Sequence, residues 1–199
     1  MERIVFASSN PGKLREFGAL LEPLGIAIVP QAELGIADAE EPHLTFVENA
    51  LAKARHASRD ARLPAFADDS GICVAALGGA PGVHSARFAG VGADRATADA
   101  ANNAKLVAAL RGHADRRAHY MCVIVHVREP ADPEPLVASG RWDGEVIDTA
   151  RGAGGFGYDP HFFIPALGRT AAELQGGEKN RLSHRALAAA RFVELLRER

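Results

Sequence analysis

The stretch RIVFASSNPGK, residues 3–13, starts as an apolar run and ends in a small-residue turn followed by a lysine. Residues 3–7 are predicted to form a buried strand, and residues 13–21 a helix with one apolar face. Pro11 suits the first turn of that helix, because proline has no N–H group to leave unpaired. A strand that leads directly into a helix is typical of an α/β protein.

The same pattern extends along the rest of the chain. Further strands are predicted over residues 26–29, 65–67, 120–127, 136–146 and 161–164. Further helices are predicted over residues 45–58 and 94–110. A final helix is predicted from an apolar face at alternating spacings of four and three, made of Leu182, Ala186, Ala189, Val193 and Leu196. Early crossovers and a late hairpin predict one long mixed sheet, and the absence of linkers or repeats predicts a single domain over residues 1–199.

Composition limits the classes of protein and partner. The chain has 199 residues, of which 47% are hydrophobic and 24% charged, which is typical of a globular protein and excludes a disordered one. A net charge of −2 argues against a nucleic-acid partner. No apolar run approaches the roughly 20 residues that cross a membrane, and no signal peptide is recognised, so we expect a cytoplasmic protein without a membrane partner. Cys73 and Cys122 lie in apolar runs and are expected to be reduced.

The first candidate site is the turn between the first strand and helix. It comprises Ser8, Ser9, Asn10, Pro11, Gly12 and Lys13. The N–H groups of a helix N-terminus favour phosphate, and the hydroxyls and the lysine add donors and a cation. The turn lacks the glycine pattern of a Walker A loop. An ordinary capped turn is the alternative.

The second candidate site is the pair Asp68 and Asp69, followed by Ser70, at the expected end of the strand over 65–67. Adjacent side chains of a strand point to opposite faces, so only one of the two carboxylates is expected to face a shared site. There it could hold Mg²⁺ or steer a water molecule. Glu40-Glu41, in an acidic loop, could complete a magnesium site with Asp69. A solvated turn and a solvated charge pair are the alternatives.

Two further candidate sites lie towards the C-terminal end. The glycine-rich loop over residues 152–160 contains Phe156, which could stack on a planar base. Lys179, His184 and Arg185 could reach one ligand from the start of the final helix. Arginine suits a 6-oxopurine, because O6 and N7 are both acceptors. A flexible loop and a solvated helix end are the alternatives.

Taken in order, these motifs resemble those of a known family. They are Ser8-x-Asn10-x-x-Lys13, Thr45-Phe46-x-Glu48-Asn49-Ala50, Ala67-Asp68-Asp69-Ser70-Gly71, Gly78-Gly79-Ala80-Pro81-Gly82, Ser85-Ala86-Arg87, Gly155-Phe156-Gly157-Tyr158-Asp159-Pro160, Glu178-Lys179-Asn180 and Ser183-His184-Arg185. Each motif is weak alone, but the ordered set is specific. From about residue 3 to residue 196 the chain resembles the inosine triphosphate pyrophosphatase family, whose members are dITP/XTP pyrophosphatases.

The resemblance implies Mg²⁺-dependent hydrolysis of ITP, dITP and XTP to the monophosphate and pyrophosphate. It also implies a homodimer and an elongated, two-lobed α/β fold around a long mixed sheet, with the active site in a cleft between the lobes. Asp69 is implied as proton acceptor and metal ligand, with Glu40 as the favoured second ligand and Glu41 as its rival. The implied substrate-binding residues are Ser8, Ser9, Asn10, Pro11, Gly12 and Lys13 for the phosphates, Ser70, and Phe156, Gly157, Tyr158, Asp159, Lys179, His184 and Arg185 for the base.

The chemistry of these residues agrees with such an activity. Release of pyrophosphate needs water to attack the α-phosphorus, with cations to neutralise the phosphates and a carboxylate to orient the water. We expect Asp69 to act as a ligand and water orienter rather than a strict general base. A nucleotide sensor without turnover remains an alternative, since it needs Lys13 and Phe156 but no metal. A Maf-like pyrophosphatase is a third hypothesis, against which Ser183-His184-Arg185 argues.

Overall fold

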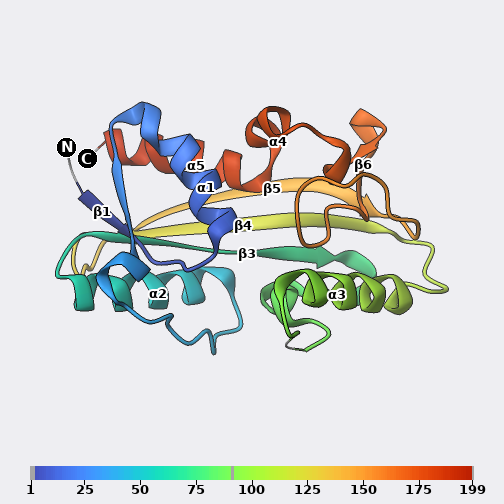
Figure 1. The fold of residues 1–199 in the computed structure, drawn as a ribbon, viewed down its shortest axis with the longest axis horizontal. Coiled ribbons are helices and arrows are strands. Elements are labelled where there is room, and N and C mark those ends of the chain that lie inside the picture. Colours follow the sequence, from blue (N-terminus) through green and yellow to red (C-terminus); the bar gives the residue numbers. More distant parts are fainter. Residues whose placement is uncertain (1–2, 91, 199) are drawn as a thin grey trace. The chain divides into compact units, whose positions relative to one another are not determined.

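The computed structural model describes residues 3–90 and 92–198, and its main element is one seven-stranded sheet (Figure 1). The strands are β1 (Arg3–Phe6), β2 (Ala27–Pro30), β3 (Ala65–Val74), β4 (Arg117–Val127), β5 (Leu136–Val146), β6 (Phe162–Ile164) and β7 (Arg169–Thr170). Their order is β2-β1-β3-β4-β5-β6-β7. β1 pairs in parallel with β2 and β3, whereas β6 is antiparallel to β5 and β7. The prediction of a mixed sheet with flanking helices is confirmed.

The described residues form five α-helices and several short 3₁₀ helices. The α-helices are α1 (Pro11–Leu21), α2 (Phe46–Ala61), α3 (Arg95–Ala109), α4 (Gly176–Leu182) and α5 (His184–Arg197). The 3₁₀ helices are η1 (Glu22–Leu24), η2 (Gln31–Leu34), η3 (Ala75–Leu77), η4 (Gly82–Arg87), η5 (Pro165–Leu167) and η6 (Ala171–Glu173). None of the described helices has both the length and the apolar character that a membrane crossing requires.

Side-chain caps fix where the longer helices begin. Asn10 accepts hydrogen bonds from two backbone N–H groups of α1, Thr45 from one of α2, and Asp94 from one of α3. Such caps satisfy backbone donors that have no partner inside the helix. The predicted starts of these helices are therefore confirmed to within one or two residues.

The chain divides into two compact units, each assembled from separated segments. The first unit comprises Met1–Asp69, Cys122–Gly140 and His184–Arg199, and the second comprises Ser70–Met121 and Arg141–Ser183. β3, β4 and β5 each contribute residues to both units. The predicted cleft between two lobes stays a prediction.

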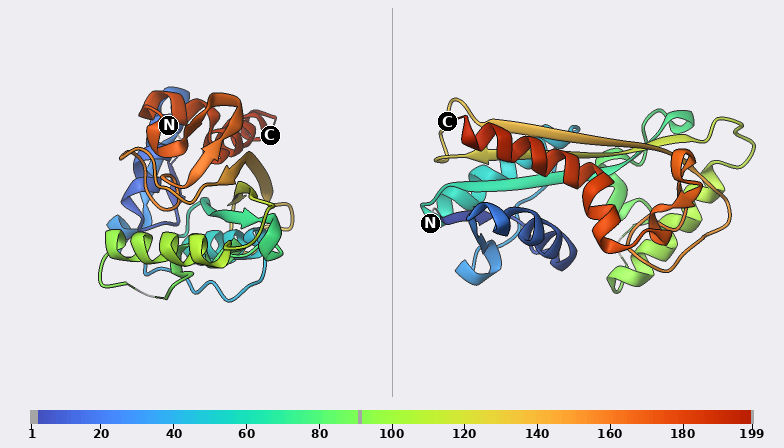
Figure 2. Two further views of the ribbon diagram at one scale, coloured as in Figure 1. Left: turned by 90° about the vertical axis from the view of Figure 1, so that its right-hand side faces the viewer. Right: turned by 90° about the horizontal axis from the view of Figure 1, so that it is seen from above.

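The core of the first unit lies on both faces of its part of the sheet. On one face Phe6 and Phe66 stack with ring centroids 4.5 Å apart, and Phe192 of α5 packs on Phe66. On the other face small residues of β1 and β3 pack against α2, among them Val5 and Ala67. Within this unit α1 and α5 cover the first face and α2 covers the second (Figures 1 and 2). The alternation of side chains along β3 therefore separates two different environments.

The core of the second unit lies between its part of the sheet and helix α3. Tyr120, Trp142 and Phe162 form a cluster of tilted rings, and Leu106 and Leu110 of the α3 segment belong to the same buried core. Within α3 the buried residues are Asn102 and Leu106, which lie four positions apart on one face of the helix. This arrangement fixes the position of α3 beside the glycine-rich loop of the same unit.

Three boundary predictions need correction. β3 does not end at Ala67 but continues to Val74, because Asp68–Gly71 keep extended backbone within the sheet. The expected continuous final helix is broken at Ser183, whose ψ of 157° is extended, so Leu182 belongs to α4 and is partly exposed, while the rest of the predicted apolar face lies on α5. The acidic loop over residues 30–43 contains the short helix η2.

Candidate active site

Asp68 and Asp69 lie side by side on β3 and send their carboxylates to opposite faces of the sheet. Both are buried, at 1% and 5% exposure. Asp68 meets residues of α1 and α5, whereas Asp69 meets residues of α2. The strand geometry predicts this separation, and the structure confirms it. Two carboxylates in such different surroundings can take different roles.

Asp68 forms a buried group with two cations. Lys13 Nζ lies 3.0 Å and Arg185 Nε lies 3.9 Å from Asp68 Oδ2. Burial raises the pKa of Asp68, but attraction by Lys13, Arg185 and Lys53 outweighs that effect and leaves the pKa below its usual value. Asp68 is therefore ionised, and it holds the ammonium of Lys13 against the sheet.

Asp69 forms a second group with Lys53, Asn49 and Glu41, of which only Glu41 was considered as its partner from the sequence. Lys53 Nζ lies 2.6 Å from Glu41 Oε1 and 3.4 Å from Asp69 Oδ1. Asn49 Nδ2 donates to Asp69 Oδ2 at 3.3 Å. Burial raises the pKa of Asp69, and the nearby charge of Glu41 adds to this, while Lys53 opposes it. A carboxylate with a raised pKa is better able to accept a proton than an ordinary surface aspartate.

Sequence reasoning gave no role to Lys53, or to Asn49 beyond its place in a quoted motif, although both contact Asp69. They lie four positions apart on α2, on the face that otherwise carries small buried residues such as Ala50, Ala54 and Ala57. A lysine and an asparagine inside a stripe of alanines are unusual, because buried polar groups need partners. That irregularity in the apolar face was the available signal.

The acidic loop brings Glu41, rather than Glu40, to this group. Glu40 has an exposed side chain, while Glu41 is half-buried and bound to Lys53. The prediction that Glu40 is the second metal ligand stays untested. The contacts of Glu41 favour the rival that the sequence left open.

The donor set of Glu41 and Asp69 fits a magnesium ion. Mg²⁺ prefers oxygen ligands and is often held by one or two carboxylates, with water and substrate phosphates completing its shell. Both carboxylates already bind one cationic group, the ammonium of Lys53, so they favour positive charge at a shared position. Among the described residues there is no group of three or more His, Cys, Asp or Glu side chains that could hold a metal.

The turn expected to bind phosphate has a complete internal cap. Asn10 Oδ1 accepts from Gly12 N at 2.9 Å and from Lys13 N at 3.3 Å, while Ser8 Oγ accepts from Asn10 N at 3.2 Å. Ser9 Oγ donates to Asp38 Oδ1 at 2.6 Å. The capped turn that the sequence left as an alternative is therefore present. Of the predicted donors, the side chain of Lys13 is the one that carries full positive charge.

The glycine-rich loop is fixed from several sides within the second unit. Asp159 Oδ2 accepts from Phe156 N at 2.9 Å and from Lys179 Nζ at 2.6 Å. Tyr158 Oη donates to Ser85 O at 2.8 Å. Gly155 has a φ of +73°, and a Cβ there would collide with the Asp159 carboxylate. The loop is thus an ordered element and not the flexible linker that was the alternative.

The residues predicted to bind the base fall into two groups. Phe156, Gly157, Tyr158, Asp159 and Lys179 lie together in the second unit, where Lys179 Nζ is 5.0 Å from the centroid of the Phe156 ring. His184 and Arg185 belong to the first unit and begin α5. The expectation that Lys179, His184 and Arg185 extend from one helix start is wrong, because the break at Ser183 places Lys179 on α4. Ser70, half-buried on β3, directly follows Asp69.

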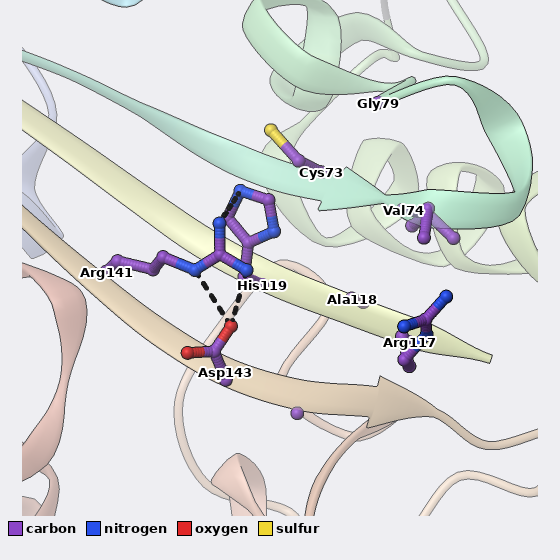
Figure 3. A pocket seen from close by; sticks show the side chains of 10 residues that line it. Cys73, Val74, Gly79, Arg117, Ala118, His119, Arg141 and Asp143 are labelled. Atoms are coloured by element: carbon purple, nitrogen blue, oxygen red, sulfur yellow. Dashed lines mark hydrogen bonds and ion pairs between the residues drawn. The ribbon is translucent and has the colours of Figure 1, made fainter.

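A pocket of about 580 Å³ opens elsewhere in the second unit (Figure 3). Its lining includes Cys73, His119, Arg141 and Asp143 and none of the predicted site residues. Arg141 Nε donates to Asp143 Oδ1 at 2.8 Å, so these charges already compensate each other. Burial raises the pKa of the Cys73 thiol, which keeps it protonated and weakly nucleophilic.

Comparison with known proteins agrees with these motifs. The model of the Ham1 family matches residues 4–195. A protein of Ralstonia nicotianae named dITP/XTP pyrophosphatase is 68% identical over 197 residues, which cover 99% of this chain and 98% of that protein. A protein of Burkholderia pseudomallei with the same name is 66% identical and covers 98% of this chain and 94% of its own length.

Solved structures give the same result. A HAM1 protein from Coxiella burnetii is 47% identical, with a TM-score of 0.93 and full coverage of both chains. A nucleoside-triphosphatase / dITP/XTP pyrophosphatase from Mycobacterium abscessus is 40% identical, with a TM-score of 0.75 over 96% of this chain and 98% of the other. The similarity in sequence and in structure thus extends over nearly the whole chain.

Proposed function

The chain belongs to the Ham1 family, and on that premise we propose that it is a nucleoside triphosphate pyrophosphatase acting on dITP, ITP and XTP. The products are the nucleoside monophosphate and pyrophosphate, and the reaction removes these nucleotides from the pool. The activity named for the relatives supports the substrate class. The contacts of Lys13, Glu41 and Asp69 support the products and the metal requirement.

One observation carries this proposal. In the first unit, the adjacent carboxylates Asp68 and Asp69 each bind a buried or nearly buried lysine, Lys13 and Lys53 respectively. Buried cations held by carboxylates are oriented in advance, so they can neutralise phosphate charge without reorganising. A triphosphate with a bound metal ion needs positive groups for its phosphates and negative groups for the metal. The two lysines and the two carboxylates supply these groups.

We assign the metal site to Glu41 and Asp69. Mg²⁺ bound there would offset negative charge on the phosphates and make the α-phosphorus more electrophilic. Lys13, held by Asp68, would bind phosphate oxygens from the face of α1. The proposed requirement for Mg²⁺ follows from the oxygen donor set and from the charge of the substrate.

Asp69 is the residue we propose to orient the attacking water. The carboxylate would accept a hydrogen bond from that water and so orient it as the new oxygen–phosphorus bond forms. The bond from the α-phosphorus to the bridging oxygen breaks, and the electron pair leaves with pyrophosphate. Asn49, which donates to Asp69 Oδ2, keeps the carboxylate in one orientation during this step.

The second unit supplies the groups for the base. We propose that the half-buried ring of Phe156 stacks on the purine and that Lys179 donates to an acceptor at position 6. Adenine carries an amine donor at that position, and the ammonium of Lys179 cannot accept a hydrogen bond from it. A site built to hydrogen-bond an acceptor can reject a nucleotide that lacks the acceptor by a factor on the order of 10⁴. We also propose that Arg185 recognises the acceptors O6 and N7 of the purine. The homodimer and the cytoplasmic location are further parts of the proposal.

The decisive experiment separates the reaction from simple binding. The purified protein is incubated with ITP, XTP, ATP and GTP, with and without Mg²⁺, and the products are identified by chromatography. We expect monophosphate and pyrophosphate from ITP and XTP, and only in the presence of metal. Orthophosphate as the first product would place the attack at the terminal phosphorus and contradict the proposal. Tight binding of ITP without turnover would support a nucleotide sensor instead.

A further inference from the structure

Both backbone polar groups of Gly157 are bound by side chains of helix α3. Gly157 N donates to Asp99 Oδ2 at 2.7 Å, and Gly157 O accepts from Asn103 Nδ2 at 2.8 Å. All three residues belong to the second unit. One residue of the glycine-rich loop is therefore held through both of its backbone polar groups by one helix, through contacts between residues more than 50 positions apart in the sequence.

The two helix residues are themselves fixed. Asp99 and Asn103 lie four positions apart and so share one face of α3. The Asn103 amide also donates to Asp99 O at 2.9 Å, and Asp99 Oδ1 accepts from Arg95 Nε at 3.0 Å. The Asp99 side chain is only 16% exposed. Because each side chain has a second bond that sets its rotamer, Gly157 is bound to a rigid support.

The residue before Gly157 is Phe156, and the cationic groups of Arg95 and Lys179 lie near its ring. Arg95 Cζ lies 5.4 Å and Lys179 Nζ lies 5.0 Å from the ring centroid, which are cation–π distances. Phe156 N is bound to Asp159, so its backbone is fixed on that side as well. The backbone on both sides of the Phe156 side chain is thus held in place, and this backbone positions the ring.

We propose that Asp99 and Asn103 are positioning residues for the base of the substrate, which act through Gly157 and set the orientation of the Phe156 ring. This inference rests on the proposed function, because that function assigns the ring to the purine. The N–H and C=O groups of Gly157 are already engaged by α3. Gly157 therefore contributes to recognition by placing a stacking surface and not by hydrogen bonding to a base edge.

The test compares variants of Asp99 by steady-state kinetics with ITP and Mg²⁺. Asp99→Ala removes the acceptor for Gly157, and we expect KM for ITP to rise about tenfold with kcat changed by less than about twofold. Asp99→Asn keeps an acceptor oxygen and is expected to recover most of the lost affinity. Asn103→Ala is expected to act like Asp99→Ala.

Two controls separate positioning from loss of structure. Asp94→Ala removes the cap of the same helix without touching Gly157, so it measures what weakening α3 does by itself. Inorganic tripolyphosphate, which has the phosphate chain without a base, is measured as a competitive inhibitor. Its inhibition constant is expected to stay unchanged in Asp99→Ala, because the proposed function assigns the phosphate groups to Lys13 and its neighbours and not to Asp99 or Gly157.

Three results would overturn this assignment while leaving the proposed function intact. They are an unchanged KM for ITP in Asp99→Ala, an equal rise in Asp94→Ala, and a parallel loss of tripolyphosphate inhibition. If the wild-type protein shows no turnover, the same variants are compared by calorimetric binding of ITP. A wild-type protein that neither hydrolyses nor binds ITP would refute the proposed function, and the role of Asp99 with it.

Discussion

Lys13 Nζ lies 3.0 Å from Asp68 Oδ2, and the two side chains are 14% and 0% exposed. An ion pair this deep is costly to break from one side, because the remaining charge loses both water and partner. The pair also fixes the position of the Lys13 ammonium, which extends from the first turn of α1. Its removal should therefore affect folding and phosphate binding together.

Replacing Asp68 tests the first of these effects. Asp68→Asn leaves Lys13 and Arg185 without their anionic partner, and we expect the free energy of unfolding to fall by about 3 kcal/mol. Urea denaturation followed by circular dichroism measures this change. Asp38→Asn, which alters an exposed hydrogen bond of the neighbouring loop, serves as the control and should cost less than about 1 kcal/mol. Equal losses in the two variants would contradict the importance of the buried pair.

Replacing Lys53 tests the second carboxylate group. Lys53→Met removes the ammonium that Glu41 and Asp69 share, a charge that we assign to phosphate neutralisation. We expect kcat with ITP to fall by roughly 100-fold, while Lys53→Arg keeps the charge and loses less. Pyrophosphate release at saturating ITP measures both variants. Full activity of Lys53→Met would remove Lys53 from the mechanism.

The adjacent glutamates form a matched pair for locating the metal site. Glu41→Gln should raise the Mg²⁺ concentration needed for half-maximal activity by at least about tenfold. The same substitution at Glu40, whose side chain is exposed, should change that concentration by less than about twofold. Titration of activity with Mg²⁺ measures both. The opposite result would restore Glu40 as the ligand and assign Glu41 only to Lys53.

The turn between β4 and β5 predicts a pH-dependent contribution to stability. Asp132 accepts from Arg128 Nη2 at 2.6 Å and from the backbone N–H groups of Arg128 and Glu134, and these bonds hold its pKa well below the usual value. A depressed pKa stabilises the folded state above about pH 4, where the unfolded aspartate is also ionised, and that stability is lost as the pH falls. We expect Asp132→Asn to cost about 1–2 kcal/mol at pH 7.

The measurement is urea unfolding at a series of pH values. The difference between wild type and Asp132→Asn should shrink steadily from pH 5 towards pH 2. A difference that stays constant over this range would show that packing, and not the charge of Asp132, stabilises the turn.

Gly140 lies at the contact between β5 and α5. A Cβ at this position would collide with His184 O and approach Ala188 N to 2.5 Å, so the strand and helix meet through a residue with no side chain. Gly140→Ala should separate them and lower the melting temperature by several degrees, as expected for overpacking of about 1–3 kcal/mol. Differential scanning calorimetry tests this, with Gly177→Ala, where nothing lies nearby, as the control.

The periodicity of the sequence was enough to predict the sheet, its flanking helices and the opposite directions of Asp68 and Asp69. These features depend on local spacing and on the burial of one face, which a single sequence records. The local pattern also identified Lys13 as a candidate phosphate-binding residue, because a strand followed directly by a helix start can be recognised from neighbouring residues. The resemblance added the roles, since no local rule connects a glycine-rich loop to a base.

Other features depended on partners far away in the sequence. Lys53 was missed because its importance comes from Glu41 and Asp69, which reach it only in the folded sheet and helix. The break at Ser183 was missed because the spacing of apolar residues continues across it. The bonds from α3 to Gly157 were missed because Asp99 looks like an ordinary polar residue on a helix surface. In each case a contact, and not a propensity, decides the structure.

The assembly of the first unit from three separated segments has a consequence for biosynthesis. A ribosome makes Lys13 and Asp68 early, but Phe192 and Arg185, which complete the aromatic core and the buried charge group, come from the last of these segments. Until then Phe66 can pack against Phe17 of α1 but lacks its contact with Phe192 of α5. Such a chain depends on late, long-range contacts and is a natural client for chaperones that shield apolar surface during translation.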